Sequence, residues 1–88
     1  MSMKDLIAGE LEKRLAPTRL VVTDDSEQHR GHAGWREGGE THFTVDIVSP
    51  AFEGKSRVER HRLVNESLFA AFERGVHALA IKARAPGE

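Results

Sequence analysis

The stretch that decides the fold runs from residue 42 to residue 48 and reads His42-Phe43-Thr44-Val45-Asp46-Ile47-Val48. Apolar and polar residues alternate along it, which is the period of a β-strand with one buried face. The apolar side is formed by Phe43, Val45 and Ile47, and the more polar side by His42, Thr44 and Asp46. Ser49-Pro50 follows directly and is typical of a strand end. We therefore predict a strand whose two faces have different environments.

Downstream of this strand, residues 56–74 have the spacing of the main helix and residues 76–83 that of another strand. The predicted helix has one broad apolar face, made of Val58, Val64, Leu68, Phe69, Ala71 and Phe72. Gly75 is placed to cap its C-terminus. A strand, a helix and a strand in succession require a crossover connection, which makes the two strands parallel.

Upstream, residues 3–15 are predicted to form a helix, because Met3, Ile7, Leu11 and Leu15 lie on one stripe. Residues 19–24 form a short β-branched strand, which should be antiparallel to residues 42–48 because no helix separates them. The order is αββαβ. It predicts a small two-layer α+β domain in which helices cover one face of a mixed three-stranded sheet. Periodicity leaves open whether the last strand lies beside the first or the second.

The composition limits the function. The 88 residues allow a single domain, residues 1–88, with a loop over residues 25–41 and a tail over residues 84–88 that we expect to be loose. There are 13 Lys and Arg against 14 Asp and Glu, which argues against bulk electrostatic coating of nucleic acid. No cysteine is present, so disulfides, a Cys nucleophile and metal sites built from this chain's own thiolates are excluded. We expect a cytoplasmic protein, or an organelle-matrix protein if the chain has been trimmed, since no stretch is long and apolar enough for a membrane span.

Five histidines are a high number for so short a chain. His29 and His32 have an H-x-x-H spacing in the predicted loop, and two such imidazoles can chelate a metal. His77 begins the last strand, at a rim that a loop histidine could approach. The alternatives are solvated loop histidines and a strand-end histidine bonded to backbone. His61 lies on the apolar helix face, which favours a packing role, and His42 on the less buried face of its strand.

A basic segment opens the main helix and contains Lys55, Arg57, Arg60 and Arg62. Such a segment can meet phosphate, or it can be a solvated face with local ion pairs. Catalysis has little support: Ser26 near His29 lacks a third member of a triad, and no glycine-rich phosphate loop is present. We predict that the protein is not an enzyme.

Over nearly its whole length the chain resembles the BolA-like protein family. The resemblance rests on four segments taken together, which are Asp24-Asp25-Ser26, Gly39-Glu40-Thr41-His42-Phe43, residues 52–64 from Phe-Glu-Gly-Lys-Ser to Leu-Val, and Val76-His77-Ala78-Leu79-Ala80-Ile81. It implies an αββαβ domain similar to the type II KH fold. It also implies a partnership with monothiol CGFS-type glutaredoxins, in which a shared [2Fe–2S] cluster serves iron–sulfur trafficking and iron regulation.

The resemblance also implies the ligands. His77 carries over as the last-strand ligand, and His29 or, alternatively, His32 as the loop ligand. Glu27 stands where the family often has a further histidine. Cysteines of the glutaredoxin and of glutathione would complete the cluster, so the isolated chain should hold none and exist as a monomer or weak homodimer. Protonated imidazole cannot ligate, so cluster binding should weaken as pH falls.

Some family members are described as transcriptional regulators. The alternative that the resemblance implies is therefore a KH-like DNA-binding regulator that uses Lys55, Arg57, Arg60 and Arg62. The chain lacks the G-x-x-G clamp of true KH proteins.

Overall fold

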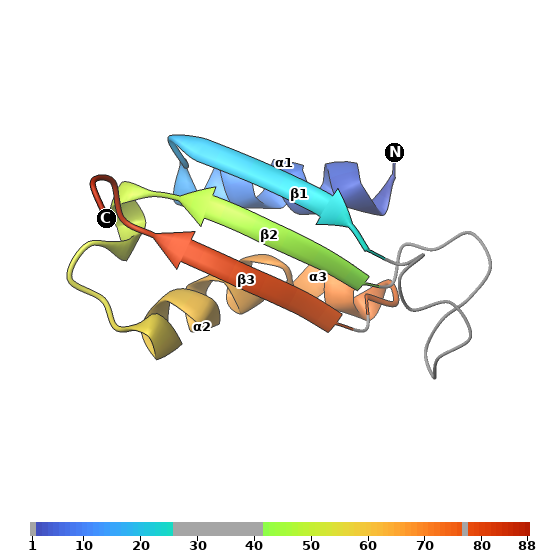
Figure 1. Cartoon of the computed structure of the whole chain (residues 1–88). Helices are drawn as coiled ribbons and strands as arrows, with labels where there is room; N and C mark the ends of the chain where they lie inside the picture. The colour runs from blue at the N-terminus through green and yellow to red at the C-terminus, as the bar shows by residue number, and fades with distance from the viewer. Residues whose placement is uncertain (1, 26–41, 77) are drawn as a thin grey trace.

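The computed structural model describes residues 2–25, 42–76 and 78–88. The elements follow the predicted αββαβ order, with a one-turn helix in the crossover and the main helix in two parts (Figure 1). They are α1 (Met3–Leu15), β1 (Arg19–Asp24), β2 (His42–Val48), η2 (Pro50–Phe52), α2 (Arg57–Ser67), α3 (Phe69–Glu73) and β3 (Ala78–Arg84). None of the helices in the described ranges is long and apolar enough to cross a membrane.

The described strands form one sheet in the order β1-β2-β3, so the last strand lies beside the second. β1 runs antiparallel to β2, with Val22 opposite Val45. β3 runs parallel to β2, with Ile81 opposite Val45. The predicted mixed sheet is confirmed, and β2, the strand with the clearest alternation, is its central strand.

The helices lie on one face of the sheet, which gives the predicted two layers (Figure 1). Phe43, Val45 and Ile47 point into the layer between sheet and helices and are buried, as the alternation predicts. α1 contributes Ile7, Leu11 and Leu15 to the same core. From β3, Leu79, Ile81 and Ala83 pack against it.

α1 is joined to the end of β2 by one buried hydrogen bond. The Ser49 hydroxyl donates to the Leu15 carbonyl over 2.5 Å. Leu15 is the last residue of α1, where carbonyls have no partner within the helix. The same hydroxyl accepts from the Ala51 amide at 3.1 Å and so caps η2.

Replacing Ser49 with alanine should therefore lower the free energy of unfolding by about 1–3 kcal/mol, because the Leu15 carbonyl would stay buried without this partner. Chemical denaturation measures the loss. Ser67→Ala is a matched control: the Ser67 hydroxyl donates to Leu63 at 2.8 Å inside α2, where that carbonyl already belongs to the helical ladder. Equal losses in the two variants would contradict a special role for Ser49.

The prediction of one continuous helix over residues 56–74 is wrong. α2 ends at Ser67, Leu68 leaves helical geometry at φ −106° and ψ 18°, and α3 begins at Phe69. The apolar face drawn across this break is also partly wrong, because Val58 is 65% exposed and Phe69 66% exposed. Leu63, which is not among the residues predicted for that face, packs against the core. Ser56 is not helical but caps α2, and its hydroxyl accepts from the Glu59 amide at 3.2 Å.

Gly75 ends α3 as predicted. Its φ of +111° lies in the region that glycine adopts without strain. The Gly75 amide donates to Phe72 at 3.1 Å and the Val76 amide to Ala71 at 3.3 Å, which together form a Schellman motif. β3 then begins at Ala78 and ends at Arg84, two residues and one residue later than predicted.

The residues that were expected to form a loose tail make specific contacts. Ala85 is only 3% exposed. The Glu88 amide donates to the Ala85 carbonyl at 3.2 Å, and the Ala85 amide donates to the Glu88 carboxylate at 3.1 Å. The chain thus turns back after β3 and brings the Glu88 side chain against α2.

Candidate functional site

The three histidines predicted as metal ligands, His29, His32 and His77, lie outside the described residues. Within residues 2–25, 42–76 and 78–88, no group of three or more His, Asp or Glu side chains is arranged to hold a metal ion. The described residues next to those histidines in the sequence show which strand ends carry the predicted site.

These elements meet at one end of the sheet, which we call the loop end and define by Asp25, His42 and Ala78. The Asp25 amide donates to the His42 carbonyl at 2.8 Å, and His42 is the register partner of Ala78. The segment 26–41, with His29 and His32, connects the first two of these residues, and residue 77 precedes the third. The carboxyl end of β1 and the amino ends of β2 and β3, which both candidate segments adjoin in the sequence, thus lie at the same end of the sheet (Figure 1).

The loop end contains a cavity of about 250 Å³. It is lined by Asp25, His42, Phe43, Ala78, Leu79 and Ala80. Beside it, the Thr44 hydroxyl donates a short hydrogen bond to the Asp25 carboxylate, which holds Asp25 against β2. His42 is only 9% exposed, so the prediction of a less buried position is wrong for this residue. Small side chains at Ala78 and Ala80 leave space beside a polar rim.

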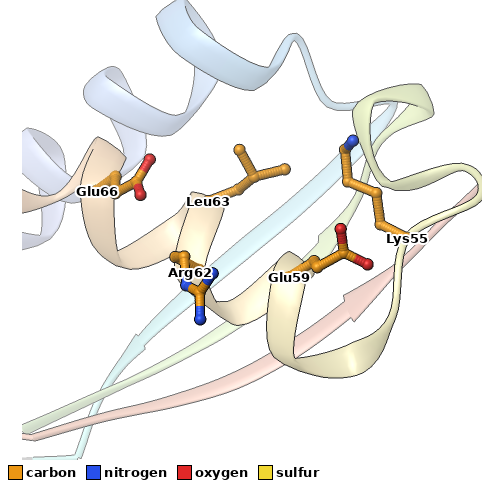
Figure 2. A pocket seen from close by; sticks show the side chains of 5 residues that line it. All are labelled: Lys55, Glu59, Arg62, Leu63 and Glu66. Carbon is orange, nitrogen blue, oxygen red and sulfur yellow. The ribbon is translucent and has the colours of Figure 1, made fainter.

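The four basic residues of the predicted segment do not all line the same site. Lys55, Arg57 and Arg60 line a groove of about 420 Å³ between the start of α2 and β3. Arg62 instead lines a separate pocket with Lys55, Glu59, Leu63 and Glu66, in which the two carboxylates lie along α2 on either side of Leu63 (Figure 2). His61 lies in the groove and is half-buried rather than packed in the core.

Sequence reasoning missed two basic residues of the groove, Lys82 and Arg84. A signal for them was present, because a crossover helix runs back along the strand that follows it. The start of α2 must then lie near the carboxyl end of β3, where both residues stand.

Arg60 is held by the tail. Its two terminal nitrogens donate to the Glu88 carboxylate at 2.5 Å and 2.7 Å, a bidentate pair, and one of them lies 3.5 Å from the Ala83 carbonyl. The hydrogen bonds from Arg60 and from the Ala85 amide lower the pKa of Glu88 from 4.5 to about 2. Arg84 also has a carboxylate partner, Asp46, at 3.0 Å. Two of the groove's cations are therefore already paired.

The lowered pKa of Glu88 predicts a pH dependence of stability. The pair contributes fully above pH 4.5, where unfolded and folded forms are both ionised, and its contribution is lost as pH falls to about 2. The difference in unfolding free energy between the natural chain and Glu88→Gln, measured by denaturation across this range, should shrink accordingly. Glu53→Gln, at an exposed carboxylate with no ion pair among the described residues, is the control for loss of one negative charge. A difference that is constant over the whole range would contradict the pairing.

Comparison with known proteins agrees with the fold. The sequence profile described as "BolA-like protein" matches residues 11–88. SufE-like protein 1, chloroplastic/mitochondrial, from Arabidopsis thaliana is 50% identical over 86 residues, which cover 93% of this chain and 23% of that protein. "Uncharacterized protein in cobS 5'region" from Sinorhizobium sp is 46% identical over 89 residues, covering 100% of this chain and 96% of that protein.

Among solved structures, BolA1 from Arabidopsis thaliana matches with a TM-score of 0.88 at 40% identity, and the match covers 100% of this chain and 96% of that one. The element order, the mixed sheet and the sequence identity point to the same conclusion. The chain belongs to the BolA-like protein family.

Proposed function

We propose that this BolA-like chain is the partner of a monothiol CGFS-type glutaredoxin and provides one side of a bridging [2Fe–2S] cluster in iron–sulfur trafficking or iron regulation. The observation that supports this best is the loop end of the sheet. Asp25 and His42 are bonded at 2.8 Å and Ala78 pairs with His42, so the chain segments that carry all three candidate ligands start from neighbouring points.

The donor chemistry fits half of such a cluster. The chain offers imidazoles and no thiolate, and its described residues form no complete metal site. His77, with His29 or His32, would hold one iron, and the remaining sulfur ligands would come from the glutaredoxin and glutathione. When bound, a [2Fe–2S] cluster supplies one-electron redox chemistry, and histidine ligation raises its reduction potential. The bonds of Asp25 to His42 and Thr44 would keep the base of the ligand-bearing segment against β2.

Co-expression with a CGFS glutaredoxin tests this function. We expect a heterodimer that co-purifies with glutathione and shows the visible absorption of a histidine-ligated [2Fe–2S] cluster. A glutaredoxin whose CGFS cysteine is replaced by serine should yield no coloured complex. A colourless natural pair, prepared anaerobically with iron and sulfide, would rule the proposal out.

The DNA-binding alternative has less support from the arrangement of the charges. Arg60 is engaged by Glu88, and Arg62 faces a pocket that contains Glu59 and Glu66. Lys55, Arg57 and Arg62 are the exposed members of the predicted set, and Lys55 lines the same pocket as Arg62. No catalytic role is proposed.

A further inference from the structure

The charged side chains that line the groove between α2 and β3 are all basic. We call it the basic groove and define it by Lys55, Arg57, Arg60, His61, Lys82 and Arg84. The described side chains that line it include no carboxylate. Lys55, Arg57 and Lys82 are exposed, and none of them makes an ion pair with another described residue. Three cations at this surface are thus available to an anionic ligand.

The molecule itself shows which anion the groove accepts. Two of its arginines bind carboxylates of the described chain: Arg84 pairs with Asp46 at 3.0 Å, and Arg60 binds Glu88 bidentately at 2.5 Å and 2.7 Å. The planar guanidinium matches a carboxylate in this way, and the pair is charge-assisted. Arg60 is mostly buried, with 14% of its side chain exposed, and its Nε has no hydrogen-bond partner among the described residues. The Glu88 side chain is 46% exposed, so it lies on the solvent side of the pair.

A second feature of the groove is a strand edge that pairs with no other described strand, although the Arg60 guanidinium lies 3.5 Å from its Ala83 carbonyl. β3 is the last strand in the order β1-β2-β3, so one side of its backbone faces away from β2. The Arg84 carbonyl points toward β2, because it accepts from the Ser49 amide at 3.0 Å. Backbone direction alternates along a strand, so the amide and carbonyl groups of Ile81 and Ala83 point outward into the groove that these residues line.

Cations flank this edge on both sides. Lys55 and Arg57 come from the start of α2, on the helix side, and Lys82 projects from the exposed side of β3. An extended peptide added to a strand edge gains main-chain hydrogen bonds and directs successive side chains to the two sides. Acidic side chains on such a peptide would meet a cation on either side.

We propose that the basic groove binds an acidic peptide segment of a partner protein in extended conformation, paired to the edge of β3, and that Glu88 competes with this segment for Arg60. A nucleic acid fits less well. The chain has a net charge of −1, the described lining of the groove includes no Phe, Tyr or Trp on which bases could stack, and phosphate oxygens have no hydrogen to donate to the outward carbonyls of Ile81 and Ala83. This proposal is independent of the glutaredoxin partnership.

The test uses the whole chain and a labelled peptide that alternates glutamate and valine over about ten residues. Fluorescence anisotropy should show binding that weakens with salt, and NMR should show the amides of Ile81 and Ala83 shifting on titration. Arg57→Gln combined with Lys82→Gln should weaken binding and raise the Kd roughly three- to tenfold. Lys4→Gln combined with Lys13→Gln removes the same charge from the exposed surface of α1 and should leave the Kd unchanged.

Two further variants examine the edge and the competitor. The same peptide with N-methyl groups on alternate residues keeps its charge but cannot pair with a strand, and it should bind at least tenfold more weakly. Glu88→Gln should tighten binding about fivefold by releasing Arg60. Equal binding of the N-methylated peptide, an unaffected Kd in the Arg57/Lys82 variant, or weaker binding by Glu88→Gln would overturn the proposal. Tighter binding of a single-stranded oligonucleotide of equal charge would also overturn it, in favour of a nucleic-acid site.

Discussion

Replacing His77 with alanine is expected to abolish the cluster-bridged heterodimer with a CGFS glutaredoxin. A [2Fe–2S] cluster held partly by this chain needs its imidazole ligands, and the family resemblance assigns one of them to His77. The residue directly precedes Ala78, which pairs with His42 at the loop end of the sheet. A missing ligand leaves an iron with an open position, so the loss should be nearly complete. The measurement is the visible absorption and circular dichroism of the co-purified complex.

His61→Ala is the matched control for this experiment. His61 lies in the basic groove, on α2 and away from the loop end, so its removal should leave the cluster spectrum unchanged. His29→Ala and His32→Ala, made separately, identify the second ligand: one should mimic His77→Ala, and the other should retain the cluster. An iron-loaded heterodimer with an unaltered spectrum in His77→Ala would contradict the assignment of His77 as a cluster ligand.

The second large effect concerns stability. Phe52→Ala should lower the free energy of unfolding by about 3–5 kcal/mol, because a fully buried phenylalanine would be replaced by a cavity. Phe52 is 0% exposed and belongs to η2, the short helix through which the chain passes from β2 to α2. A domain of this kind has a total stability on the order of 5–15 kcal/mol, so this loss is a large fraction of the total.

Phe69→Ala is the control, since it makes the same chemical change at a side chain that is 66% exposed. Its effect should stay within about 0.5 kcal/mol of zero. Urea denaturation followed by circular dichroism compares the two variants. If Phe69→Ala were as destabilising as Phe52→Ala, the break between α2 and α3 would be misplaced, because a continuous helix would bury Phe69.

Where a short-range pattern decided the structure, the sequence was a sufficient guide. Alternation along residues 42–48 predicted the buried side chains Phe43, Val45 and Ile47, because one face of the strand packs against the helices, and it failed only for His42 at the loop end. The repeat of Met3, Ile7, Leu11 and Leu15 likewise predicted α1. Gly75 could be identified as a cap because glycine is strongly favoured at a positive φ.

Patterns failed at a local break in the main helix and at one contact between residues far apart in the chain. The Leu68 amide donates to both Val64 at 3.1 Å and Asn65 at 3.2 Å, and the helix is interrupted there without glycine or proline. A wheel that assumes 100° per residue loses its phase at such a point, so Phe69 was placed in the core. The contact between Arg60 and Glu88 joins residues far apart in the chain, and no local period encodes it.

The candidate site was predictable in part. The predicted strand directions indicate that the carboxyl end of β1 lies beside the amino ends of β2 and β3. The register confirms this for Asp25, His42 and Ala78. The helix-side cations of the basic groove were predicted, but Lys82 and Arg84 were not. The crossover connection brings these two residues of β3 beside the start of α2. The roles of His29, His32 and His77 as ligands stay predictions.

The central position of β2 has a consequence for how the molecule opens. Every backbone amide of β2 faces a neighbouring strand, β1 on one side and β3 on the other, so the amides of Val45 and Ile47 can meet solvent only when the sheet separates. The outward amides of Ile81 and Ala83 need no such event. The rate of amide hydrogen exchange should therefore depend on the strand in which an amide lies, and not on how deeply its side chain is buried. Exchange in β2 reports global unfolding, and exchange at the outer edge of β3 reports only local access to that edge.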